Sequence, residues 1–272
     1  MNGIDAKLER LRHDLTEHGS LLVAYSGGVD SALVLRVANE VLGARAIGVT
    51  ADSPSVSRRE LDGARRIAAA IGARHLILST DEVDDPHYAA NPGNRCYFCK
   101  RELYGRLAGL ARSEGIRRVA NGTNLDDLGD HRPGLLAADE LEVVSPLRDA
   151  GMTKSDVRAA ARRLELEVWD KPASPCLASR IPYGTAVTRA RLSAVELAEE
   201  RLRELGLRQV RVRHFGATAR IEVPDDELER VRRHIDALRR PFAEIGFVEL
   251  ELAEFRSGAL NSALDGALNV VD

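Results

Sequence analysis

The chain has 272 residues, of which 44% are hydrophobic and 30% charged, and its formal net charge at pH 7 is -3. This composition excludes a disordered chain, and the near-balanced charge excludes a global basic surface that would attract nucleic acid. The charged, amphipathic start lacks the apolar core of a signal peptide, and nowhere do 18 apolar residues follow one another. We therefore expect a cytoplasmic protein without a membrane segment.

In the first half of the chain, short apolar runs alternate with amphipathic stretches. The runs are not themselves alternating, which is typical of strands buried on both faces of a sheet. Ser57 and Glu60 form a capping-box pattern at the start of a helix that should stop at Gly72. The alternation of strands and helices predicts an α/β fold with a doubly wound, parallel, five-stranded sheet. The predicted strands are 21–25, 46–50, 75–79, 118–121 and 141–145.

The pattern changes after Gly184. Helical spacing over 192–205 is followed by two strictly alternating segments, 209–214 and 219–223, which is the mark of half-buried strands. A further helix from about 225 to 239 and an apolar run at 247–252 complete this part. We predict two domains, 1–185 and a smaller C-terminal α/β domain over 186–272.

A glycine-rich motif follows the first predicted strand directly and opens a helix. Paired glycines let a backbone approach a phosphate closely, while consecutive N–H groups, hydroxyls and a helix N-terminus attract the anion. The motif is neither GxxxxGK[ST] nor GxGxxG, so it indicates neither a kinase-type P-loop nor a dinucleotide fold. The other reading is an ordinary glycine-rich turn. The motif consists of Ser26, Gly27, Gly28, Val29, Asp30 and Ser31.

A second polar motif follows the fourth predicted strand, at the same carboxyl edge of the sheet, where ligands bind in such folds. Asp126 and Asp127 are candidate carboxylates for Mg²⁺ or for positioning a ligand, and Arg132 can hold a phosphate or carboxylate. For any one of these residues, turn chemistry or a solvated arginine is an equal alternative. The nucleotide-binding candidates in this motif are Gly122, Thr123, Asp126, Asp127 and Arg132.

The chain has only three cysteines. Cys96 and Cys99 form a CxxC pair, whereas Cys176 lies in a proline-rich loop that presents its thiol from a defined backbone. Three cysteines cannot build a disulfide framework, and a CxxC in a reducing compartment more often binds metal or exchanges electrons. Simple burial remains an alternative. Zinc is disfavoured because no histidine stands at finger-like spacing from the cysteines.

The segment 26–31 (SGGVDS) resembles the pyrophosphate loop, or PP-loop, of the ATP pyrophosphatases. Together with KPASPCLASRIPYG at 171–184, GTNLDD at 122–127 and NRCYFCK at 94–100, the chain resembles the LarE family of ATP-dependent sulfur transferases. This resemblance implies an adenine nucleotide alpha hydrolase-like fold. It implies an ATP-pyrophosphatase domain over 1–185 and a domain for substrate binding and assembly over 186–272.

The resemblance also implies a reaction. LarE proteins adenylate the carboxylates of pyridinium-3,5-biscarboxylic acid mononucleotide with ATP, releasing pyrophosphate, and then replace AMP with sulfur to give thiocarboxylates for the nickel-pincer nucleotide cofactor. Some members sacrifice the sulfur of the cysteine matching Cys176. In others the cysteines matching Cys96, Cys99 and Cys176 hold a [4Fe-4S] cluster that carries the sulfide. The implied catalytic residues are Asp30, Cys176, Ser179 and Arg180.

Two arginines of the C-terminal part also match the family. Strand geometry places Arg211 and Arg213 on one face, where two guanidiniums suit the phosphate of a mononucleotide. Glu199 and Glu222 match family positions for substrate or metal. A solvated strand face with paired charges is the alternative reading.

The resemblance implies two partners, a sulfide donor and a nickel-insertion protein of the same pathway. It also implies a homo-oligomer, for which a hexamer is one option. A tRNA thiolase is the first alternative, but no basic or zinc-binding RNA module accompanies the motifs. An amide-forming PP-loop synthetase is the second, although no glutaminase domain is present to supply ammonia. A non-enzymatic protein that binds adenine nucleotides is the third.

Overall fold

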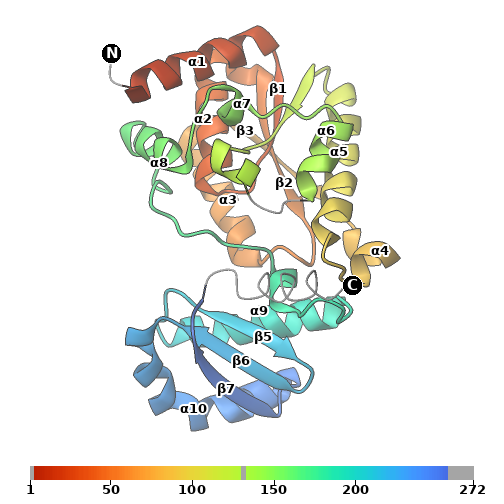
Figure 1. Cartoon of the computed structure of the whole chain (residues 1–272), viewed down its shortest axis with the longest axis vertical. Coiled ribbons are helices and arrows are strands. Elements are labelled where there is room, and N and C mark those ends of the chain that lie inside the picture. The colour runs from red at the N-terminus through yellow and green to blue at the C-terminus, as the bar shows by residue number, and fades with distance from the viewer. Residues whose placement is uncertain (1–2, 130–132, 257–272) are drawn as a thin grey trace, which may run out of the picture. The chain divides into compact units, whose positions relative to one another are not determined.

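A computed structural model describes residues 3–129 and 133–256 of the chain (Figure 1). The chain divides into two compact units, the first formed by Met1–Glu82 and Asn94–Ser174 and the second by Val83–Gly93 and Pro175–Asp272. The segment 175–185, assigned to the first domain from the sequence, thus belongs to the second unit. No described helix is both long and apolar enough to cross a membrane.

The first unit is built on a parallel sheet. Its order is β3 (Arg74–Ser79), β2 (Ala46–Asp52), β1 (Leu21–Ala24) and β4 (Arg118–Ala120). The chain moves outward from β1 to β3 and then returns to the other side of β1, so the winding reverses between β1 and β4. Ligands of doubly wound folds bind at the carboxyl edge beside such a reversal. The predicted α/β doubly wound class is confirmed.

The described sheet has four strands, one fewer than expected. The predicted fifth strand at 141–145 contributes only an isolated parallel bridge between Ala120 and Val144. Glu142 has a φ of 52°, which interrupts an extended backbone, and Pro146 begins the short helix α7 (Pro146–Asp149) one residue after the predicted strand. These local features shorten the strand to a single bridge.

Helices cover both faces of this sheet (Figure 1). Leu21 and Val23 of β1 point into one core, and Leu22 points into the other. This alternation is what a strand buried on both faces requires. The first core lies under α1 (Gly3–His18), α2 (Val29–Leu42), α3 (Arg58–Ile71) and α8 (Lys154–Arg163), and the second under α5 (Arg95–Ser113) and α6 (Gly134–Glu140).

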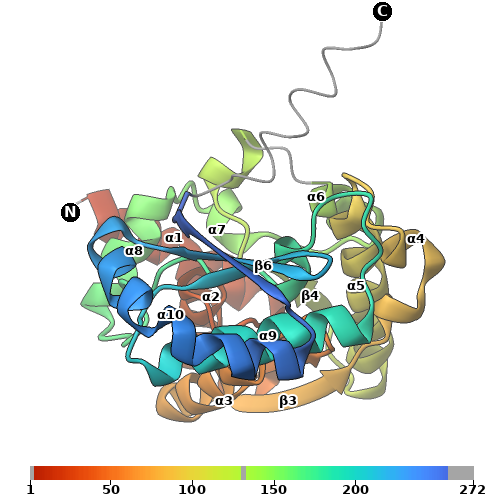
Figure 2. The same ribbon diagram turned by 90° about the horizontal axis from the view of Figure 1, so that it is seen from below.

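The second unit is a small mixed sheet covered on one face by two helices, α9 (Arg189–Glu204) and α10 (Asp225–Ile245) (Figure 2). Alternating residues such as Val212 and Ile221 point into the core beneath these helices. The predicted strands of this part are confirmed. The sheet order is β5 (Arg211–Phe215), β6 (Thr218–Val223) and β7 (Glu249–Glu254), with β5 antiparallel and β7 parallel to β6. The unit also contains α4 (Pro86–Ala89) and the 3₁₀ turn η4 (Leu177–Arg180).

Candidate active site

The predicted anion cradle, Ser26–Ser31, forms the turn between β1 and α2. Ser31 Oγ accepts from the backbone N of Ser26 at 3.1 Å and donates to the carbonyl of Gly28 at 3.2 Å, so the loop closes on itself. Gly28 is the N-cap residue and supplies no side-chain cap, which leaves N–H groups at the start of α2 available to an anion. Val29 is buried and anchors this first turn.

Two glycines let neighbouring segments pack directly on the cradle. Gly27 has a φ of 73°, and a Cβ there would lie 2.9 Å from the Cα of Ala64 in α3. A Cβ on Gly122 would lie 2.8 Å from the backbone N of Ser31. The structure therefore brings the two predicted nucleotide motifs together, and each glycine is required where its backbone passes the other chain segment.

Asp30 is held from two sides within the first unit. Lys154 Nζ lies 2.5 Å from its Oδ2, and Asn124 Nδ2 donates to its Oδ1 at 3.2 Å. Lys154 is the first residue of α8, whose capping box of Thr153 and Asp156 is fully formed. In the sequence, Lys154 stands next to a helix-capping threonine and gives no sign of this contact with Asp30.

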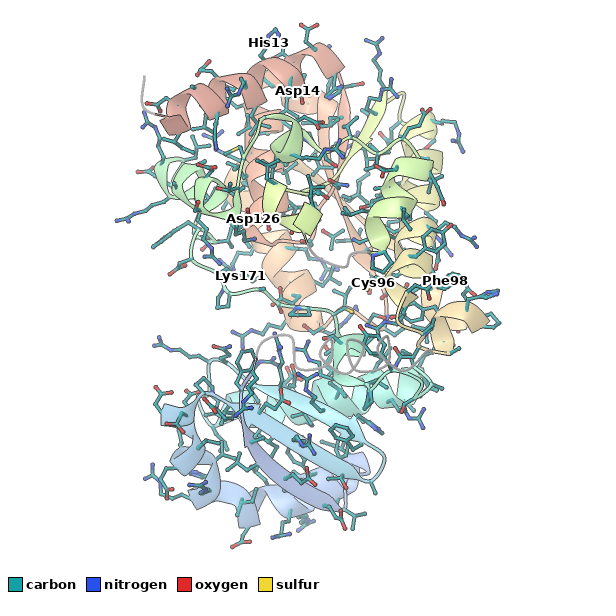
Figure 3. All side chains as sticks on the ribbon, in the orientation of Figure 1. His13, Asp14, Cys96, Phe98, Asp126 and Lys171 are labelled. Atoms are coloured by element: carbon teal, nitrogen blue, oxygen red, sulfur yellow. The ribbon has the colours of Figure 1, made fainter. Side chains whose placement is uncertain are left out.

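A second lysine reaches the cradle from the segment after α8. Lys171 Nζ donates to the carbonyl of Gly27 at 3.3 Å and to Glu60 Oε2 at 2.7 Å (Figure 3). Glu60 lies in the first turn of α3, whose N-cap Ser57 accepts from its backbone N–H. The only sequence signal for Lys171 was its place at the start of the 171–184 motif.

The carboxylates of the second motif serve the backbone. Asp126, at the exposed surface (Figure 3), accepts from the backbone N of Lys154 at 2.9 Å, and Asp127 accepts from that of Asn124 at 3.0 Å. Thr123 is held through its own backbone, its N–H donating to Asn121 Oδ1 at 3.0 Å. Asx turns occur at Asn121 and Asn124, whose side-chain oxygens accept from the backbone N–H two residues further on. Arg132 lies outside the described residues.

The three cysteines are divided between the two units. Cys96 and Cys99 lie in the first two turns of α5, three residues apart and hence on one helix face (Figure 3 labels Cys96). Cys96 is exposed and Cys99 half-buried, while Cys176 is exposed in the second unit. In the described part of the chain, neither unit by itself gathers three His, Cys, Asp or Glu side chains as a metal site.

A buried arginine holds the loop of Cys176. Arg180 is 4% exposed; its Nε donates to Glu199 Oε1 at 2.8 Å and its Nη1 to the carbonyl of Pro175 at 2.7 Å. Nη1 also donates to Ser179 Oγ at 3.0 Å and to the carbonyl of Cys176 at 3.3 Å. Glu199 additionally accepts from Arg203 and from the backbone of β5. The predicted residues Cys176, Ser179, Arg180 and Glu199 thus form one network.

The two strand arginines share a face of the sheet but differ in their partners. Arg213 is buried, donates to Glu222 Oε1 at 2.6 Å and to the carbonyl of Ser179 at 3.2 Å. Arg211 is half-buried, and its guanidinium lies 4.4 Å from the ring centre of Phe255.

Burial lowers the pKa of Arg211, and the nearby charges of Arg180 and Arg213 lower it further. Within the described residues its guanidinium makes no hydrogen bond or ion pair, and Glu222 Oε2 is a buried acceptor without a donor. This corner of the second unit is therefore cationic. Among the described side chains it offers an unused donor, the guanidinium of Arg211, and an unused acceptor, Oε2 of Glu222.

Comparison with known proteins shows which proteins this chain is similar to. A scan against models of protein families matched none. The chain is 45% identical over 265 residues to an uncharacterised protein of Synechocystis, covering 96% of this chain and 99% of that protein. It is 39% identical over 248 residues, 90% of each chain, to the pyridinium-3,5-bisthiocarboxylic acid mononucleotide synthase of Lactiplantibacillus plantarum. More distantly, it is 26% identical over 221 residues to the tRNA-specific 2-thiouridylase MnmA of Rickettsia felis, covering 66% and 60% of the two chains.

Proposed function

Since the chain belongs to the LarE family of the PP-loop superfamily, we propose that it converts the carboxylates of pyridinium-3,5-biscarboxylic acid mononucleotide into thiocarboxylates at the expense of ATP. The product would serve nickel-pincer nucleotide biosynthesis, with a sulfide donor and a nickel-insertion protein as partners and a homo-oligomer as the working form. The observation that carries the proposal is the contact of Gly122 with the start of α2, which joins two polar motifs into one phosphate cradle.

In the first half-reaction, a carboxylate oxygen of the substrate attacks the α-phosphorus of ATP. The bond from that phosphorus to the bridging oxygen breaks, pyrophosphate leaves, and an acyl-adenylate forms. The cradle binds the leaving pyrophosphate through the N–H groups of α2 and the hydroxyls of Ser26 and Ser31. Lys154, held beside the cradle by Asp30, adds a positive charge where the phosphates accumulate negative charge.

The metal ion and the cluster belong to this proposal. Asp30, on the first turn of α2, is the carboxylate that would hold Mg²⁺, which neutralises phosphate charge when bound. Cys96, Cys99 and Cys176 would hold the [4Fe-4S] cluster, and the donor set fits because thiolates are the usual ligands of such clusters. The cluster, when bound, supplies an iron that carries the sulfide.

In the second half-reaction, sulfur attacks the acyl carbon and AMP leaves with its electron pair, so that a thiocarboxylate replaces the carboxylate. Arg180 fixes the loop of Cys176 through the carbonyls of Pro175 and Cys176, which orients the sulfur-bearing residue. The substrate phosphate binds beside Arg211, whose guanidinium has no hydrogen-bond partner among the described residues.

The proposal is tested by adding the mononucleotide to anaerobically purified protein with ATP and measuring pyrophosphate. Release that depends on the mononucleotide supports adenylation, and binding of ATP without release would favour a nucleotide-binding protein instead. Iron and acid-labile sulfide are measured on the same sample and on Cys96→Ala, Cys99→Ala and Cys176→Ala. No iron after reconstitution, with loss of one H₂S from Cys176 on reaction, would replace the cluster by the sacrificial route.

A further inference from the structure

The segment 169–176 joins the first unit to the second and is held at its two ends by different arginines. At the first end, Arg158 of α8 donates to the carbonyls of Trp169 and Lys171, both at 3.0 Å. At the second, Arg180 holds the carbonyls of Pro175 and Cys176. Between these anchors the chain is exposed and has neither helix nor strand. We call this segment the connector.

Lys171 is the connector's contact with the cradle. Its ammonium group is shared between the carbonyl of Gly27 and the carboxylate of Glu60, and both lysine and glutamate are about one quarter exposed, at 25% and 26%. The carbonyl belongs to the loop that would enclose the nucleotide phosphates. The cation therefore stands at the edge of the cradle, already paired but not deeply buried.

The ion pair between Lys171 and Glu60 costs little to break in exchange for a contact with phosphate. Part-exposed ion pairs contribute little net stability, and Glu60 in the first turn of α3 keeps a favourable interaction with the helix dipole when its lysine departs. A polyphosphate carries more charge than one carboxylate and offers several acceptors to the three donors of an ammonium group. The arriving phosphates compete with Glu60 and with the Gly27 carbonyl for the same cation.

We propose that Lys171 binds the β- or γ-phosphate of ATP, after leaving Glu60, and that Arg158 is the positioning residue that holds the lysine's backbone for this exchange. The connector that leads to Cys176 is then ordered by nucleotide, so ATP occupancy and the sulfur-bearing loop are coupled through the chain itself. This inference rests on the proposed use of ATP.

A purely structural ion pair makes a different prediction, which allows a sharp test. If Lys171 and Glu60 only brace the connector, then Lys171→Met and Glu60→Gln remove the same interaction and have the same effect. If the lysine binds phosphate, Lys171→Met weakens ATP binding, whereas Glu60→Gln does not weaken it. The first removes the ligand, whereas the second removes its competitor.

The experiment measures binding of α,β-methylene-ATP and of AMP by calorimetry, with hydrogen exchange of peptides covering the connector. We expect Lys171→Met to weaken binding of the ATP analogue about tenfold or more, which is the usual effect of losing a charge-assisted hydrogen bond. The affinity for AMP should be unchanged. Glu60→Gln should raise the affinity for the analogue or leave it unaltered. Lys171→Arg should restore part of the affinity.

The analogue should slow hydrogen exchange in the connector of the native protein, but not in Lys171→Met. Arg158→Gln should lose most of this protection with a smaller loss of affinity. Arg163→Gln, on the same helix but paired with Asp5, is the matched control and should behave as the native protein. Equal weakening by Lys171→Met and Glu60→Gln would overturn the inference while leaving the proposed function intact. A native protein that binds no ATP analogue would overturn both.

Discussion

Lys154 Nζ lies 2.5 Å from Oδ2 of Asp30, although the two residues are 124 positions apart in the sequence. Asp30 lies in the first turn of α2, the helix that follows the cradle. The pair neutralises Asp30 before any ligand arrives, and Asn124 fixes the other oxygen of the same carboxylate. Both side chains remain partly exposed, at 37% and 24%. The proposed function requires the lysine to turn to a phosphate and to release the carboxylate for a metal ion.

Substitution of Lys154 tests this arrangement. Lys154→Met should weaken ATP binding about tenfold, since it removes one charge-assisted hydrogen bond to phosphate, while the fold is retained. Lys7→Met is the matched control because Lys7 also pairs with an aspartate at 2.5 Å, Asp156, but outside the cradle. Calorimetric titration with ATP compares the two variants, and equal affinities would contradict the role assigned to Lys154.

The close approach at Gly122 predicts a strong effect of a single methyl group. Gly122→Ala should abolish ATP binding and lower the free energy of unfolding by about 1–3 kcal/mol, because the new Cβ meets the backbone of Ser31 at 2.8 Å. Gly105→Ala, in α5 with nothing within 4 Å of the added Cβ, should raise the free energy of unfolding by about 0.5–1 kcal/mol and keep ATP binding. Urea unfolding with and without ATP measures both.

The cap of α8 predicts a pH dependence of stability. Partial burial raises the pKa of Asp156, but hydrogen bonds from Lys7 and Thr153 outweigh it and lower the pKa to about 2 from 3.8. A carboxylate with a lowered pKa stabilises the folded state above its unfolded pKa, and this contribution disappears as the pH falls from about 4 towards 2.

The contribution should be about 1 kcal/mol, because solvent screens a pair so near the surface. Acid unfolding of native protein and Asp156→Asn is the measurement. The difference in stability between them should be present at neutral pH and shrink across that window. A difference that is constant down to pH 2 would show that the ionised carboxylate does not matter.

The two strand arginines should separate into a binding and a structural residue. Arg211→Gln should raise the KM for the mononucleotide with little change in stability, because its guanidinium has no hydrogen-bond partner in the described part of the chain. Arg213→Gln should destabilise the second unit by about 3–5 kcal/mol, since it leaves buried Glu222 without its cation. Steady-state kinetics measures the KM of both variants, and thermal unfolding measures their stability. An equal loss of stability in the two variants would contradict the distinction.

The sequence predicted features that depend on neighbouring residues. The strand, cradle and helix of residues 21–42 follow one another directly, so local pattern was sufficient to place them. The helix start at Ser57 and the alternation along the strand of Val212 and Arg213 could be predicted for the same reason. The missing fifth strand depended on a positive φ at Glu142, which no apolar pattern reveals.

Contacts between residues far apart in the chain could not be predicted from the sequence. Lys171 reaches Glu60 over 111 residues, and a lysine in a loop motif gives no sign of its partner. Asp126 and Asp127 had two readings, and only the positions of Lys154 and Asn124 show that both accept backbone hydrogen bonds. Likewise, nothing in the alternation of β5 distinguishes the buried Arg213 from the half-buried Arg211.

The most direct test of the central claim is mass spectrometry of the mononucleotide after anaerobic incubation with the protein, ATP and sulfide. The account predicts replacement of carboxylate oxygen by sulfur, with one AMP and one pyrophosphate formed for each sulfur added. Consumption of ATP that leaves the mononucleotide without sulfur, or modification of tRNA in its place, would contradict it.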